Sequence, residues 1–297
     1  MASQVINGKA FEWAVGNEIV QSYGFKLKND DIAEYNKQCF FHNQITQVKR
    51  DNFLRSASES VKHILEKEKI TESKGLVSFL PDSKGQEGDV RDIVITTDHK
   101  ELGISCKTNH DAFKHSRLSQ KNDFVKRWGL HSDGCSKQYF DTIFPIFEEL
   151  KEIKKKSAGK AKWADIEDVP KRFYWPLLNA FSDEIERVSS PEMCRNFIKY
   201  IVGSFDFYKI ISTNKKVLIQ AFNINQTLNT TSQPLPTQID FVKDKNTTQY
   251  SKTISFDKGW VFNFRIHNAS SRVEASLKFD VTALALSYKH YTHHIDY

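Results

Sequence analysis

Residues 88–107 read GDVRDIVITTDHKELGISCK, two apolar runs separated by a charged turn. The β-branched content of these runs predicts two strands, at residues 90–96 and 102–108, joined as a hairpin through the polar sequence DHK. Antiparallel pairing of the two strands would place Asp92 beside the sequence SCK that ends the second strand. The stretch therefore predicts a sheet whose edge carries a carboxylate next to a lysine.

Alternation along the second strand puts Ser105 and Lys107 on one side and turns Cys106 toward the packed interior. A carboxylate beside a lysine suits phosphodiester hydrolysis, which needs a divalent cation and a group that binds the developing negative charge. Mg²⁺ takes one or two carboxylates together with phosphate and water, so Asp92 is the expected metal ligand. Spacing alone also fits a surface hairpin with solvated charges.

Asp89 lies three residues before Asp92, a spacing that sends the two side chains to opposite faces of a regular strand. The two carboxylates can converge only if residues 88–89 still belong to the preceding turn. We favour Asp92 as the principal metal ligand and keep Asp89 as a second contributor.

Outward from the hairpin, apolar residues at helical spacing predict helices before and after it. Residues 111–118 are expected to form a loop or a short helix, and Pro145 to kink or restart the helix that contains it. The predicted helices span residues 9–23, 30–45, 51–69, 136–156, 173–188 and 192–202.

Beyond residue 204 the chain consists of short β-branched segments separated by turn signals. The expected architecture is an α/β (α+β) nuclease-like core with inserted helices and a β-rich C-terminal region. Its domains would be three consecutive regions: a core with the N-terminal helices and the hairpin at residues 1–150, a helical region at 151–203, and a β-rich region at 204–297. The predicted C-terminal strands are residues 207–212, 216–222, 239–243, 252–256, 260–268 and 277–285.

The chain has 297 residues and a formal net charge of +6, with a sequence pI of about 8.9. A basic excess of this size fits a polyanion such as DNA as partner. The four cysteines show no metal-binding spacing, and no signal peptide or membrane-spanning run is recognisable. We expect a cytoplasmic protein with reduced thiols and no membrane contact.

Four stretches resemble one known family: GKAFEWA at residues 8–14, GDVRDIVI and GISCKTNHDAFKHSRLS within 88–119, the residues Cys135-Ser136, Tyr139-Phe140 and Pro145-Ile146-Phe147 within 135–147, and FRIHNASSRVEASLKFDV at 264–281. They are similar to the HaeIII-type family of type II restriction endonucleases. The resemblance implies a PD-(D/E)xK nuclease core and Mg²⁺-dependent cleavage of double-stranded DNA at a short palindrome. For this family the palindrome is GGCC, cut in the middle. A palindrome suggests a homodimer, and a restriction enzyme implies a protecting DNA methyltransferase.

The resemblance places the family's catalytic pattern on Asp92 and Lys107, and we count Ser105 with them. Ser105 stands where the wider superfamily usually carries Glu or Asp, so the second metal-binding carboxylate must come from elsewhere. Glu12 in the first helix occupies the position of an active-site glutamate in many such nucleases, ahead of the weaker candidates Glu59 and Glu66. A solvated helix residue is the alternative for Glu12.

Two donor-rich segments are candidates for DNA contact, because Arg, Lys, Asn and Ser bind phosphates and base edges. The alternatives are a plain polar loop and an ordinary half-exposed strand. The candidates are Asn109, His110, Lys114, His115 and Arg117 in the first segment, and Arg265, His267, Asn268, Ser270 and Arg272 in the second, with Lys278 in the next strand.

Two rival functions stay open from the sequence. One is a repair or junction-resolving nuclease on the same fold. The other is a DNA-binding protein that has lost catalysis, which Ser105 in place of the expected carboxylate would explain.

Overall fold

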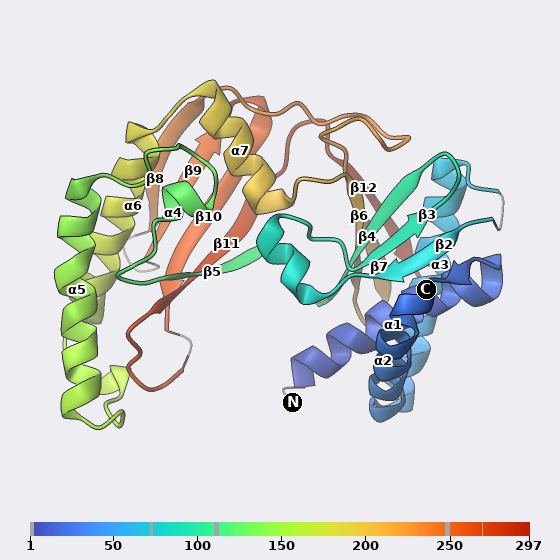
Figure 1. The fold of residues 1–297 in the computed structure, drawn as a ribbon, viewed down its shortest axis with the longest axis horizontal. Helices are drawn as coiled ribbons and strands as arrows, with labels where there is room; N and C mark the ends of the chain where they lie inside the picture. Colours follow the sequence, from blue (N-terminus) through green and yellow to red (C-terminus); the bar gives the residue numbers. More distant parts are fainter. Residues whose placement is uncertain (1–2, 72–73, 110–112, 247–249, 269) are drawn as a thin grey trace. The chain divides into compact units, whose positions relative to one another are not determined.

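The computed structural model of this chain describes residues 3–71, 74–109, 113–246, 250–268 and 270–297, with backbone alone at residues 3, 85–87, 114–116 and 244–246. The chain forms two compact units (Figure 1). Unit 1 comprises residues 1–111, 202–234 and 289–297, and unit 2 comprises residues 112–201 and 235–288. Each unit combines helices with one sheet, which confirms the expected mixed α/β class.

The sheet of unit 1 has the strand order β1-β2-β3-β4-β6-β7-β12 among the described residues. The pairs β1/β2 and β4/β6 are parallel, and the other neighbours are antiparallel. The central position of β4 follows from its run of buried residues. The strands are β1 (Lys26–Leu27), β2 (Leu76–Phe79), β3 (Ile93–Thr96), β4 (Glu101–Thr108), β6 (Phe207–Ser212), β7 (Lys216–Phe222) and β12 (Tyr291–Asp296).

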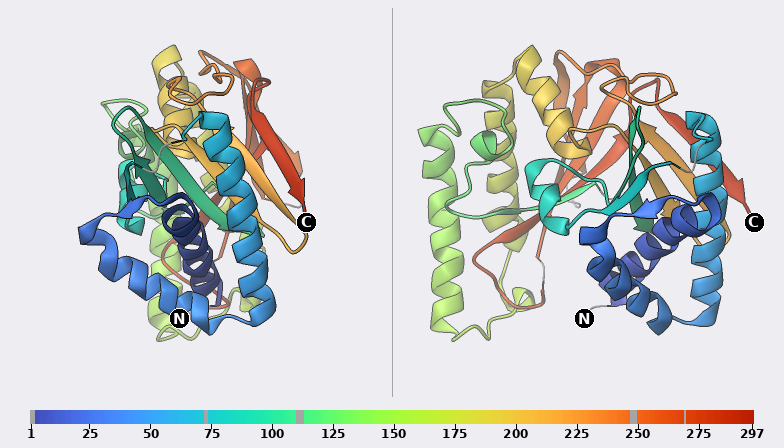
Figure 2. Two further views of the ribbon diagram at one scale, coloured as in Figure 1. Left: turned by 90° about the vertical axis from the view of Figure 1, so that its right-hand side faces the viewer. Right: turned by 45° about the vertical axis from the view of Figure 1, so that its right-hand side comes forward.

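Helices of unit 1 pack on this sheet through their apolar stripes. Ala10, Phe11 and Ala14 of α1 are fully buried, and the Phe11 ring lies 5.2 Å from the ring of Phe53 in α3. Helix α1 contacts β2 and β4, and helix α3 contacts β6 and β7 (Figure 2). The packing of α1 brings its residue Glu12 toward β4. The helices are α1 (Ser3–Tyr23), α2 (Ile32–Gln44) and α3 (Gln47–Glu68), with short turns η1 (Asn29–Asp31) and η2 (Asp82–Glu87).

The sheet of unit 2 is antiparallel throughout, with the order β5-β11-β10-β9-β8. Its strands are β5 (Lys114–Leu118), β8 (Ile239–Asn246), β9 (Ser251–Phe256), β10 (Trp260–His267) and β11 (Leu277–Ala285). Its helices are α4 (Phe124–Arg127), α5 (Lys137–Lys156), α6 (Trp175–Arg187) and α7 (Pro191–Val202), with the short helices η3 (Trp163–Asp165), η4 (Pro170–Tyr174) and η5 (Asp257–Gly259).

The two faces of this second sheet differ in character. Phe264 of β10 and Phe279 of β11 pack against Phe181 of α6, with ring centroids 5.2 Å and 4.7 Å away. The alternate positions of these strands point to the other face and carry polar side chains: Asn263, Arg265 and His267 in β10, and Lys278 and Asp280 in β11. Unit 2 therefore has one face packed on helices and one polar face.

Most strand expectations are confirmed, and the differences from the structure are as follows. Residues 114–118 form the strand β5, so the loop or short helix expected at 111–118 is wrong; β5 contains few apolar residues and is held by pairing with β11. The first hairpin strand begins at Ile93 and leaves Asp92 just before it. Two strands were not predicted: β1, which pairs with β2, and β12, which pairs with β7. The units are also interleaved along the chain, unlike the three consecutive regions expected.

Each of the six predicted helices overlaps a helix of the structure. The restart expected at Pro145 is wrong, because helix α5 runs as one helix from Lys137 to Lys156 with Pro145 inside it. Within the described residues, no helix has the length and apolar character that a membrane span requires.

Candidate active site

Asp92 lies where the hairpin opens, held by its own backbone. Its N–H donates to the Ile104 carbonyl at 2.8 Å, and its carbonyl accepts from the Leu80 N–H at 2.9 Å. Since Ile93 pairs with Ile104, Asp92 comes opposite Ser105, as the hairpin pattern predicts. The Ser105 hydroxyl donates to Asp92 Oδ2 at 3.0 Å. Ser105 thus contributes a hydrogen-bond donor at the position where a carboxylate was expected.

The same Asp92 oxygen receives two further donors from β4. The backbone N–H of Cys106 lies 2.6 Å away and the Lys107 ammonium 3.3 Å away. The Cys106 side chain is buried in the core of unit 1, so its expected turn toward the interior is confirmed. Burial alone would lower the pKa of Lys107, but the Asp92 and Glu12 carboxylates outweigh it and raise that pKa. Lys107 is therefore held as an ammonium ion.

Glu12 reaches the same group from helix α1 and is only 6% exposed. Burial raises the pKa of Glu12 to about 8, and the nearby negative charge of Asp92 adds to the rise, while Lys9 and Lys107 oppose it. The structure thus brings Glu12, Asp92 and Lys107 into one electrostatic cluster, although they lie far apart in the sequence.

Two residues that sequence reasoning missed hold the Glu12 carboxylate. Lys9, one turn earlier on α1, lies 2.9 Å from Glu12 Oε2, and Gln38 of α2 donates to the same oxygen at 3.1 Å. The helical spacing of Lys9 and Glu12 could have revealed the first contact. The second depends on the packing of α2 against α1, which no local pattern encodes.

Asp89 has a different environment from that of Asp92. The Arg91 guanidinium donates hydrogen bonds to both carboxylate oxygens of Asp89, with Nε 2.8 Å from Oδ1 and Nη2 2.8 Å from Oδ2. Arg91 also reaches Glu101 at 2.5 Å. Gly103 makes this arrangement possible, because a Cβ there would lie 2.2 Å from the Arg91 side chain. The observed contacts of Asp89 therefore form a structural ion pair.

Two carboxylates of this cluster have the chemistry to hold a divalent cation. The negative charge of Asp92 raises the energy of the charged form of Glu12, and a cation held by both carboxylates would relieve that repulsion. Among the described residues no group of three or more His, Cys, Asp or Glu side chains forms a metal cage. Two carboxylates suit Mg²⁺, which keeps water and phosphate as its remaining ligands.

The candidate DNA contacts of the C-terminal segment lie in unit 2. The Arg265 side chain is 54% exposed on β10. His267 follows it on the same side of the strand, and its Nδ1 lies 2.8 Å from the Asn268 carbonyl. Ser270 Oγ binds the Arg272 backbone at 3.0 Å and 3.2 Å, which shapes the turn after the strand.

The first candidate segment is divided between the units. Asn109 belongs to unit 1, where its N–H donates to the Ser212 carbonyl at 3.0 Å and its φ is +58°. Arg117 belongs to unit 2 and binds Glu274 at 2.8 Å. His110 lies outside the described residues, and Lys114 and His115 are described by their backbone in β5 alone.

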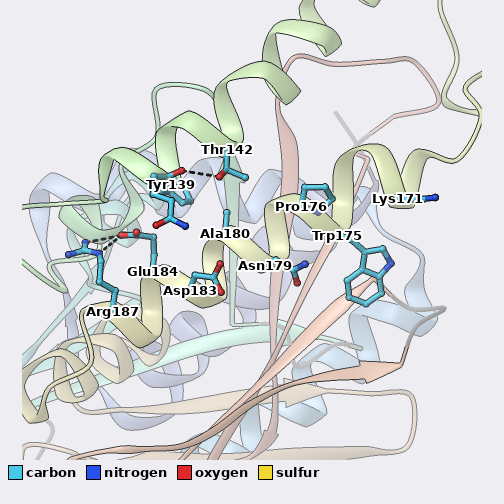
Figure 3. A pocket seen from close by; sticks show the side chains of 11 residues that line it. Tyr139, Thr142, Lys171, Trp175, Pro176, Asn179, Ala180, Asp183, Glu184 and Arg187 are labelled. Atoms are coloured by element: carbon cyan, nitrogen blue, oxygen red, sulfur yellow. Dashed lines mark hydrogen bonds and ion pairs between the residues drawn. The ribbon is translucent and has the colours of Figure 1, made fainter.

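A hollow of about 490 Å³ opens beside α5 and α6, within unit 2 (Figure 3). Its carboxylate Glu184 is held by Arg187 at 2.8 Å and by the Ser136 N–H at 3.0 Å. None of the predicted site residues lines it. The contacts of Glu184 link helix α6 to Ser136 at the start of α5.

Comparison with known proteins shows the family to which the chain belongs. The family model of the HaeIII restriction endonuclease matches residues 8–287. The type II restriction enzyme HaeIII of Haemophilus aegyptius is 36% identical over 306 aligned positions, covering 94% of each chain. No solved structure matches the chain. The expected family is thereby confirmed, and this chain belongs to the HaeIII restriction endonuclease family.

Proposed function

We propose that this chain is a type II restriction endonuclease that hydrolyses phosphodiester bonds of double-stranded DNA with Mg²⁺ as cofactor. The observation that carries the proposal is the convergence of Glu12 from α1, Asp92 from the position just before β3, and Lys107 from β4. Membership of a restriction endonuclease family supports the same reaction.

Each residue has a role that follows from its surroundings. Glu12 and Asp92 would hold the cation, which when bound offsets phosphate charge and makes water more acidic. Lys107 keeps its proton beside two carboxylates and can bind an anionic phosphate oxygen or orient the attacking water. Ser105 and the Cys106 N–H fix the Asp92 carboxylate by hydrogen bonds. Asp89 stays in its ion pair with Arg91 and would act on the site indirectly, through the backbone before β3.

The target we propose is a short palindrome, GGCC, cleaved in the middle. It rests on the resemblance to HaeIII. The polar face of unit 2, with Arg265 and with Asn268, Ser270 and Arg272 after β10, would supply contacts to the bases, and Asn109, His110, Lys114, His115 and Arg117 would contact phosphates. A palindrome favours a two-fold dimer, and host survival would require a partner methyltransferase.

Digestion of a phage genome tests this function directly. With Mg²⁺ the protein should give discrete fragments whose ends map to one palindrome, and with EDTA it should give none. Cleavage confined to branched DNA would favour a junction-resolving nuclease. Binding to duplex DNA without any cleavage would favour a protein that has lost catalysis. The buried carboxyl group of Glu12 supports the active enzyme, because it would supply the second metal ligand that Ser105 lacks.

A further inference from the structure

The polar face of the unit 2 sheet brings charged residues of two neighbouring strands together. Arg265 of β10 lies directly opposite Asp280 of β11, and His267 lies opposite Lys278. Directly opposed residues of antiparallel strands share a face. Lys278 also lies opposite Arg117 of β5, so the row continues across a third strand.

Asp280 joins two of these residues by hydrogen bonds. Its Oδ2 lies 3.5 Å from Arg265 Nη2 and also accepts from His267 Nε2. The other ring nitrogen of His267, Nδ1, binds the Asn268 carbonyl at 2.8 Å. Both partners of the ring are acceptors, so its two nitrogens are already used within the protein. His267 in this arrangement supports Asp280 and has no donor left for a base.

Arg265 has the opposite character. Its side chain is 54% exposed, whereas those of His267 and Asp280 are 29% and 14% exposed. A guanidinium carries five donors, and only one of its nitrogens contacts Asp280. The remaining donors match the O6 and N7 acceptors of guanine in the major groove.

The charge of Asp280 is unfavourable for binding DNA in general. It places a carboxylate among Arg265, Lys278 and Arg117, on a face that would meet phosphates. A role in orienting Arg265 explains why a negative charge there would help recognition. Two buried atoms on the strands beside Arg265, Ser251 Oγ and Asn263 Oδ1, have no hydrogen-bond partner among the described residues. Both atoms can therefore still accept a hydrogen bond.

We propose that Asp280, supported by His267, is a positioning residue that holds Arg265 for guanine recognition. The inference rests on the proposed function and deepens it, because it assigns target selection to this face of unit 2. A guanidinium fixed by a carboxylate loses less rotational freedom on binding than a free one, so its contact with a base is stronger.

The test compares specific with non-specific binding. The wild-type cut site is first mapped, and the protein is then titrated with a duplex containing that site and with a duplex of equal length lacking it, with Ca²⁺ in place of Mg²⁺. Asp280→Asn should reduce the preference for the site duplex about 10-fold. Its affinity for the other duplex should stay the same or increase, because a negative charge is removed.

A double-mutant cycle separates positioning from general damage. If Asp280 acts through Arg265, D280N should cause little further loss of preference in an R265A protein. The matched control is Glu149→Gln, which removes a carboxylate paired with Arg172 on the helices of the same unit. It should leave both affinities unchanged. If D280N does not fold, His267→Gln replaces it in the same cycle.

The outcomes are distinguishable from failure of the proposed function. A wild-type protein that cuts DNA at one site, with a D280N variant that keeps the full preference, overturns the inference alone. Additive effects of D280N and R265A overturn it as well. A wild-type protein that neither cuts nor prefers any duplex overturns the proposed function, and the inference with it.

Discussion

Two buried carboxylates, one in each unit, show how partners determine the role of a residue. Glu12 is 6% exposed in unit 1 and Glu184 is 4% exposed in unit 2. The pKa of Glu12 is raised to about 8 by burial and by Asp92. Burial also acts to raise the pKa of Glu184, but hydrogen bonds from Arg187 and Ser136 outweigh it and lower that pKa.

The difference lies in how fully each charge is compensated. Glu184 has an arginine, a backbone N–H and a hydroxyl as partners, so its charge strengthens the junction of α5 and α6. Glu12 has a lysine and an amide as partners but faces a second carboxylate. Burying charge at such a cost to folding is typical of functional sites. We therefore expect Glu12 to serve activity and Glu184 to serve stability.

Between these two carboxylates, the larger expected effect is the loss of cleavage rate in Glu12→Gln. Loss of a metal-binding carboxylate should lower the single-turnover rate with Mg²⁺ on the order of 100-fold. The metal-free protein should unfold at the same or a higher urea concentration, because a neutral amide is less costly to bury.

Glu59→Gln is the matched control for this change. Glu59 lies on α3 and was a rival candidate for the second carboxylate, so its replacement should leave the rate unchanged. Equal losses in both variants, or none in Glu12→Gln, would remove Glu12 from the proposed site.

A smaller effect, on stability alone, is expected for Glu184→Gln. Buried hydrogen bonds to a charged group are lost, and the free energy of unfolding should fall by about 1–3 kcal/mol in urea titrations. Cleavage at a temperature where the variant is folded should stay at the wild-type rate. Glu186→Gln, an exposed position on the same helix, is the control and should change neither quantity.

The smallest expected effect is the pH dependence of the stabilisation that Glu184 contributes. Because the pKa of Glu184 is lowered in the folded state, its stabilisation is present above the unfolded pKa of about 4.3 and is lost as the pH falls through the folded value. Urea titrations from pH 6 to pH 3 should show a shallower loss for the Gln variant than for wild type. A parallel loss in both proteins would mean that Glu184 contributes no acid sensitivity.

Local patterns predicted the hairpin that carries Asp92 and Lys107, because both strands are strongly apolar and their pairing follows from a short turn. Strand β5 was mistaken for a loop or helix since its sequence KHSRL gives no clear alternation of apolar residues. Strand β12 was missed because its sequence YTHHID contains few apolar residues and forms through pairing with β7.

The site itself was predictable in part. Asp92 opposite Ser105 follows from strand pairing, whereas the approach of Glu12 was expected from family resemblance and not from spacing. The contact of Gln38 with Glu12 could not be predicted from the sequence, because it depends on how α2 packs against α1. Asp280 was likewise unnoticed, since its role depends on the register between β10 and β11.

Cleavage and binding by a Lys107→Ala protein, measured on one duplex that carries the mapped target, test the catalytic cluster most directly. Lys107 contacts Asp92 and lies in the same charge cluster as Glu12. We expect the single-turnover rate with Mg²⁺ to fall at least about 1000-fold, while the dissociation constant with Ca²⁺ stays within about threefold, the usual spread for such effects. Site-specific cutting by this variant near the wild-type rate would contradict a catalytic centre at Glu12, Asp92 and Lys107.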